Sequence, residues 1–203
     1  MAQLRTSRTF DVILVLALVA VVWWAAGHRA AVGDWVYFLN YHPTPEVTQV
    51  AEEAHLSLAG RQLLYRTNPQ FADKATVAAA CDIERLGCID EQGRVFILDT
   101  PGQHDQAVVT AAHEMLHLAY RRLSPAKQAE LAPLIDAAMA QNTGPDLAYE
   151  LRSETTPEGR RDEAHSLLGT EFRDLPPALE QYYAQYFTDR VAVLALADKS
   201  RPQ

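Results

Sequence analysis

An uninterrupted run of apolar residues near the N-terminus is the first feature of the hydrophobic pattern. Residues 12–27 carry no charge, and Arg5 and Arg8 precede them. In a helix this run covers about 24 Å, which approaches the ~30 Å hydrocarbon core of a bilayer, and Phe10 and Asp11 extend it. The pattern predicts a single N-terminal transmembrane helix that contacts the membrane through residues 12–27, or a signal peptide.

The end of this run carries evidence for both alternatives. Ala25 and Gly27 have the small side chains that signal peptidase accepts, whereas Trp23 and Trp24 are typical of an aromatic belt at a membrane surface. We favour an uncleaved anchor, and a cleaved segment would make the protein secreted. Since the basic residues come before the run, the positive-inside rule predicts a cytoplasmic N-terminus and a domain outside the cytoplasmic membrane.

The remaining chain is long enough for one compact domain, so we expect an anchor and linker at 1–33 and a domain at 34–203. Residues 30–44 have a linker-like pattern. A helical stripe then predicts a first helix from Thr44 to near Gly60. Residues 61–67 have a strand pattern.

Apolar runs on both sides of a turn at 91–93 predict a β-hairpin whose second strand is 94–98. All later segments have helical patterns. The first spans about 105–123, the next is broken or kinked at Pro133, another begins at the Thr156 cap, and a long final helix covers 177–199. Strands in the first half and helices in the second indicate an α+β fold.

The charge balance and the cysteines narrow the possible environments. Eighteen Lys and Arg against 26 Asp and Glu give a net charge of −8, which disfavours nucleic acid as a partner. Cys81 and Cys88 are the only cysteines. One such pair in a short loop of an exported domain predicts a disulfide, because a metal site would need further ligands nearby. No feature of the sequence indicates an oligomeric state.

The stretch TAAHEMLHLAYRR, residues 110–122, contains the pattern of a catalytic zinc site. His113 and His117 stand on one face of a helix, one turn apart, so their imidazoles can bind one ion. Catalytic Zn²⁺ takes three protein ligands and keeps one position open. Glu114 can reach an attacking water and act as its general base.

With this motif on a helix that follows a strand, the chain resembles the zincin metallopeptidases. The resemblance implies a zincin-like fold, hydrolysis of a peptide or protein substrate, and an edge strand that binds the substrate, which residues 94–98 match by order. Tyr120 and Leu123 stand where metzincins need Gly and His, and Arg173 stands where aspzincins need Asp. The chain is therefore most similar to the gluzincins, whose third ligand is a glutamate on a later helix.

Glu163 is the predicted third ligand, and His165 and Glu171 are its rivals. If Glu163 binds the metal, His165 becomes a candidate donor to the oxyanion of the transition state. The alternative for His165 is an ordinary helix histidine that is capped or partly buried. Tyr182, Tyr183 and Tyr186 are further possible donors.

Three other classes fit parts of this pattern. An intramembrane protease would need its motif in an apolar span, but Arg121, Arg122 and Lys127 follow the motif. A structural zinc site would need a fourth ligand, which His165 could supply. A non-catalytic zinc-binding or interaction module of metallopeptidase fold, tethered to the membrane, would not need Glu114.

Overall fold

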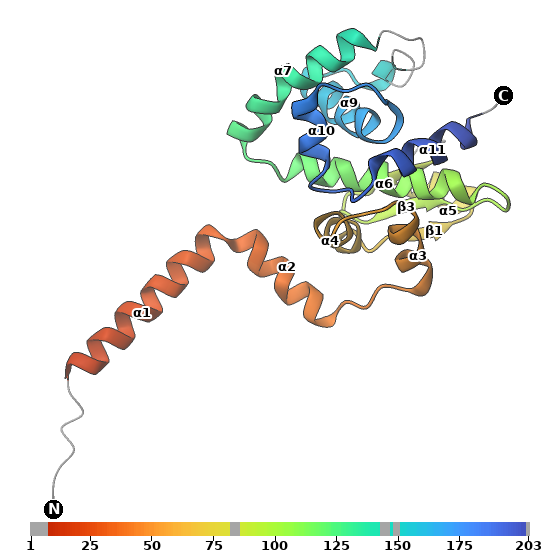
Figure 1. Ribbon diagram of the computed structural model, residues 1–203. Helices are drawn as coiled ribbons and strands as arrows, with labels where there is room; N and C mark the ends of the chain where they lie inside the picture. Colours follow the sequence, from red (N-terminus) through yellow and green to blue (C-terminus); the bar gives the residue numbers. More distant parts are fainter. Residues whose placement is uncertain (1–7, 82–85, 143–146, 148–150, 202–203) are drawn as a thin grey trace, which may run out of the picture. The chain divides into compact units, whose positions relative to one another are not determined.

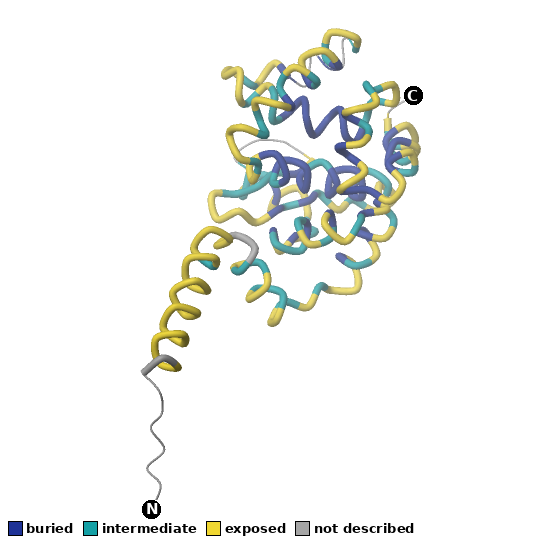
Figure 2. The backbone as a smooth tube through the Cα atoms, turned by 60° about the vertical axis from the view of Figure 1, so that its left-hand side comes forward, coloured by how far each residue is buried: buried dark blue, intermediate teal, exposed yellow. Residues whose placement is uncertain are grey.

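The computed structural model describes residues 8–81, 86–142, 147 and 151–201. The chain forms two compact units, Met1–His42 and Pro43–Gln203. The first contains α1 (Arg8–Gly27) and α2 (Arg29–Asn40). By length and composition α1 could cross a membrane, a criterion that a signal sequence also meets. Most of its residues are exposed, as the colour of the tube shows (Figure 2). The predicted apolar helix is confirmed, but α2 occupies most of the predicted linker.

The second unit begins with two short helices. Thr44 caps α3 (Pro45–Glu53) and Ser57 caps α4 (Leu58–Arg66), each through a hydroxyl that accepts a backbone N–H. The predicted single helix to Gly60 and the predicted strand at 61–67 are therefore wrong. Ser57 starts a new helix, and Gly60 lies inside it because the backbone of Tyr186 comes too close for a side chain there.

A small mixed sheet follows. It consists of β1 (Gln70–Ala72), β2 (Gly87–Ile89) and β3 (Val95–Leu98), with α5 (Lys74–Cys81) between the first two. The strand order is β1-β3-β2, in which β1 is parallel and β2 antiparallel to β3. The predicted hairpin is confirmed, and Gly93 adopts the positive φ that its turn requires. Because β3 is the central strand of this sheet, its predicted position at the edge is wrong.

The disulfide between Cys81 and Cys88 is confirmed. It joins the end of α5 to β2, so it ties one edge of the sheet to the helix before it.

The described residues that follow the sheet are mainly helical. Their elements are α6 (His104–Arg121), α7 (Pro125–Gln141), the 3₁₀ turn η1 (Leu151–Ser153), α9 (Pro157–Glu171), α10 (Pro177–Tyr183) and α11 (Arg190–Ser200). Helix α6 lies between the sheet and the C-terminal helices (Figure 1) and packs against β2, β3, α9 and α11. Helix α7 continues through Pro133, so it is not broken there. The α+β class is thus confirmed.

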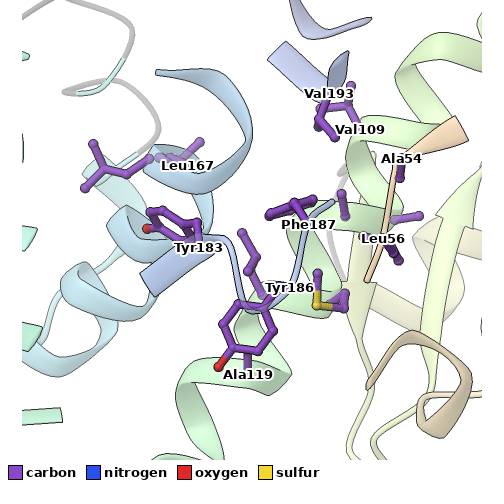
Figure 3. Packing of buried hydrophobic residues seen from close by; sticks show 14 of the residues in the cluster. Ala54, Leu56, Val109, Ala119, Leu167, Tyr183, Tyr186, Phe187 and Val193 are labelled. Atoms are coloured by element: carbon purple, nitrogen blue, oxygen red, sulfur yellow. The ribbon is translucent and has the colours of Figure 1, made fainter. Parts of the chain in front are cut away.

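The predicted long final helix is wrong, because it is interrupted between α10 and α11. Phe187 forms a β-bridge with Leu56, and the two side chains lie close together in the core (Figure 3). The N–H of Thr188 donates to the carbonyl of His55 over 2.7 Å. Asp189 then caps α11. This pairing holds the α3–α4 connection against the α10–α11 connection.

Candidate metal centre

Two histidines on α6 form the base of the candidate site. His113 and His117 are one helical turn apart, and their Nε2 atoms lie 3.1 Å from each other. The apolar face of the same helix, which includes Ala112, Leu116 and Ala119, is buried in the core. Core packing thus orients α6 so that both imidazoles point to one place.

Glu163 reaches these imidazoles from α9, which packs against α6. Its Oε1 lies 3.4 Å from Nε2 of His113 and its Oε2 lies 3.4 Å from Nε2 of His117. The possible ligand atoms of the three residues all lie within 4.8 Å of one another, so the group could hold a metal ion. Of the three candidates for the third position, Glu163 is the one that lies beside both histidines.

Asp162, beside Glu163 in the chain, contacts the other side of His117. Its Oδ1 accepts a hydrogen bond of 2.9 Å from Nδ1 of His117, and its Oδ2 accepts one of 2.8 Å from Nε of Arg121. Histidine ligands of metals usually donate their second ring N–H to a carboxylate in this way. Sequence reasoning missed Asp162, although a carboxylate next to a candidate ligand and an arginine four residues after His117 were visible signals.

The surroundings of His117 favour positive charge. Burial lowers the pKa of its imidazole, but hydrogen bonds to Asp162 and Glu163 outweigh burial and raise the pKa to about 10. Burial raises the pKa of the Glu163 carboxyl, and His113 and His117 together bring it far below its ordinary value. The pKa of Asp162 is lowered in the same way by His117 and Arg121. The site therefore concentrates carboxylates that a cation would neutralise.

Glu114 lies on α6 beside the sheet rather than in the ligand group. It is buried, and it faces β2. A Cβ built on Gly87 would lie 3.3 Å from Oε1 of Glu114 and 2.5 Å from Cγ2 of Thr110. Thr110 and Glu114 share one face of α6 because they are four residues apart. Gly87 thus packs against the helix face that carries Glu114.

His165 lies in the core, among aromatic rings from α6 and α10. It is 0% exposed, and its imidazole contacts the rings of Tyr120, Tyr182 and Tyr183. Its Nε2 is 3.0 Å from the hydroxyl of Tyr182, and burial lowers the pKa of its imidazole to about 3. Its catalytic role stays a prediction, and these surroundings favour the alternative of a buried helix histidine.

The two remaining groups of candidates contact residues outside the ligand group. Glu171 is at the end of α9, where its carboxylate pairs with Arg201 over 3.4 Å. The hydroxyls of Tyr182 and Tyr186 lie 3.4 Å apart, and the hydroxyl of Tyr183 donates to the carbonyl of His165 over 2.6 Å. Tyr182 and Tyr183 thus join α10 to His165 on α9, and Figure 3 shows Tyr183 beside α9.

No protein-family model matches this chain, and neither the curated proteins nor the solved structures contain a match to it. The function is therefore inferred from the sequence and the geometry of the site.

Proposed function

We propose that this protein is a zinc-dependent metallopeptidase that hydrolyses peptide bonds outside the cytoplasmic membrane. The observation that carries the proposal is the convergence of His113, His117 and Glu163, from two helices, on one place. The resemblance to gluzincins rests on the same three residues together with Glu114.

The donor set suits zinc. Two imidazole nitrogens and one carboxylate are the ligands of a common type of catalytic zinc site, and three ligands leave one position open. Asp162 would hold the ring of His117 in place. A zinc ion bound by these residues supplies Lewis acidity to water and to a peptide carbonyl.

The remaining steps of hydrolysis are assigned to residues of the chain. Glu114 accepts the proton of the attacking water and passes it to the leaving amine. Its burial beside β2 limits its hydration and its freedom to turn. Because β3 is central, the substrate strand must be an edge strand, and β2 is the edge strand that lies beside Glu114, so an extended substrate would lie along β2.

The proposed location is supported by the N-terminal helix and the cysteines. An anchor in α1 with the domain outside the cytoplasm agrees with a disulfide between Cys81 and Cys88, since such bonds persist in oxidising compartments. We propose a single-pass protein that acts on peptide or protein substrates near the membrane surface.

The proposal is tested with the full chain, purified in detergent and loaded with zinc. We expect about one zinc ion per chain and cleavage of unfolded casein. Glu114→Gln should keep the zinc and lose at least about 100-fold in kcat, because it removes a base and not a ligand.

Glu130→Gln is the matched control, since Glu130 is an exposed residue of α7 that pairs with Lys127. A wild-type chain that binds no zinc would refute the metal site. Zinc binding without any cleavage would instead support the non-catalytic module, and full activity of Glu114→Gln would refute the role of Glu114.

A further inference from the structure

Strand β2 is short and lies at an edge of the sheet. Its three residues pair with β3 alone among the described strands, with Gly87 opposite Ile97 and Cys88 opposite Phe96. So short a pairing provides few backbone hydrogen bonds to hold the strand in place. Other contacts must therefore contribute to its position.

One of these contacts is with the face of α6 that carries Glu114. Gly87 is buried, and a Cβ added to it would lie 2.5 Å from Cγ2 of Thr110, 3.0 Å from the carbonyl oxygen of Phe96 and 3.3 Å from Oε1 of Glu114. The first distance is a severe overlap. Only glycine allows β2 to come this close to α6.

A second constraint is covalent. Cys88 is the residue after Gly87, and its disulfide to Cys81 fixes the middle of β2 to the end of α5. Both cysteines are partly exposed. The strand that touches Glu114 is therefore held from one side by α6 and from the other by a bond that a reductant can reach.

From these contacts we propose that β2 is the positioning element of the general base. The close approach of Gly87 to α6 determines the position of the Glu114 carboxylate, and the Cys81–Cys88 disulfide holds Gly87 in that position. The inference rests on the proposed function, because it concerns the base of that reaction. If this proposal is correct, changes to Gly87 or to the disulfide lower kcat without changing metal binding.

The first test is the variant Gly87→Ala of the full chain. The added methyl must displace β2 or the side chains of Thr110 and Glu114, so we expect kcat to fall about 10- to 100-fold, since small misplacements of catalytic groups have effects of this size. The zinc content and the absorption spectrum of the cobalt-substituted protein should stay as in the wild type, because the metal ligands are not touched. A purely structural role would change those metal readouts or the yield of folded protein instead.

Thr110→Ser in the Gly87→Ala background supplies the rescue. It removes the methyl group that is closest to the added Cβ, so the double variant should recover most of the lost kcat relative to Thr110→Ser alone. Gly33→Ala is the matched control for the substitution, because a Cβ at that position would meet nothing within 4 Å beyond the backbone of its own helix.

The second test opens the disulfide without introducing strain. In the double variant Cys81→Ser and Cys88→Ser, kcat should fall several-fold while the zinc content stays the same. A water-soluble phosphine should have this effect on the wild type. The phosphine takes the oxygen of one water to become its oxide, and its two electrons with the two protons of that water convert the disulfide into two thiols.

Wild type and Glu114→Gln are measured in the same assay, so the two proposals can fail separately. An inactive wild type, or an active Glu114→Gln, overturns the proposed function. If both behave as expected, the positioning role of β2 is overturned when Gly87→Ala keeps its kcat, or loses zinc together with activity. If Gly87→Ala does not fold, unchanged kcat after removal of the disulfide overturns it.

Discussion

Asp162→Asn tests whether the site is built to hold a cation. The substitution keeps the size of the side chain and an oxygen that can accept the N–H of His117, but it removes one negative charge. The proposed site would keep all three ligands. Any loss of zinc affinity would therefore arise from the residue behind His117 and not from the ligand set.

The expected magnitude follows from burial. The side chains of Asp162 and His117 are 13% and 8% exposed, so water screens their 2.9 Å contact little. A hydrogen bond to a charged group in such a place contributes about 1.5–3 kcal/mol and one between neutral groups about 0.5–1.5 kcal/mol, so removing the charge while keeping the bond should cost about 1–1.5 kcal/mol. Arg121, the other partner of Asp162, is 52% exposed, and its pairing should contribute at most about 1 kcal/mol. We therefore expect zinc affinity to fall about 5- to 13-fold.

The assay is competition for zinc against a chromophoric chelator, with the full chain in detergent. Asp136→Asn is the matched control, since Asp136 is an exposed residue that pairs with Arg161. Arg121→Gln should lower the affinity by less than about fivefold. An affinity for Asp162→Asn within about threefold of the wild type would refute the reasoning, because the carboxylate would then not support the ligand.

Two further predictions concern the ligands. Glu163→Gln should lower zinc affinity by at least about 100-fold. His165→Gln should keep the affinity and lower the melting temperature, because it disturbs the buried contact with Tyr182. The opposite pattern in the same titration would exchange the roles of Glu163 and His165. Because the pKa of His117 is raised from 6.5 to about 10, its contribution to the stability of the zinc-free protein is complete below pH 6.5 and lost as the pH rises to about 10. Denaturant unfolding should show a loss of about 2–4 kcal/mol over this range without zinc and little loss with zinc; a flat zinc-free profile would contradict the assignment.

Much of the secondary structure could be predicted because its signals are local. The caps of α3 and α9, at Thr44 and Thr156, are side-chain hydrogen bonds within one turn of the chain. The hairpin turn depends on Gly93 and its neighbours. Errors occurred where a local signal has two interpretations. Gly60 suggested the end of a helix, but Ser57 had already begun a new one, and the packing of Tyr186 explains the glycine.

The end of the chain shows why contacts between distant residues escape sequence reasoning. Residues 177–199 are compatible with one continuous helix, yet the pairing of Phe187 with Leu56 interrupts it. That pairing joins residues 131 positions apart, so it cannot be predicted from the sequence around either residue. The central position of β3 has the same origin, because strand order depends on β1, far earlier in the chain.

The sequence by itself determined the helix that carries His113, Glu114 and His117, the apolar helix at the N-terminus and the cysteine pair, because each depends on residues within a few turns of one another. Only the tertiary structure decided the third member of the metal-binding group. Glu163, His165 and Glu171 lie on the same helix, and the packing of α9 against α6 turns Glu163 toward the imidazoles and His165 into the core. The same packing placed Asp162 behind His117 and Gly87 beside Glu114. Such contacts between elements arise when the buried faces of the helices and the sheet pack together. This packing depends on residues far apart in the chain, so no short stretch of sequence predicts it.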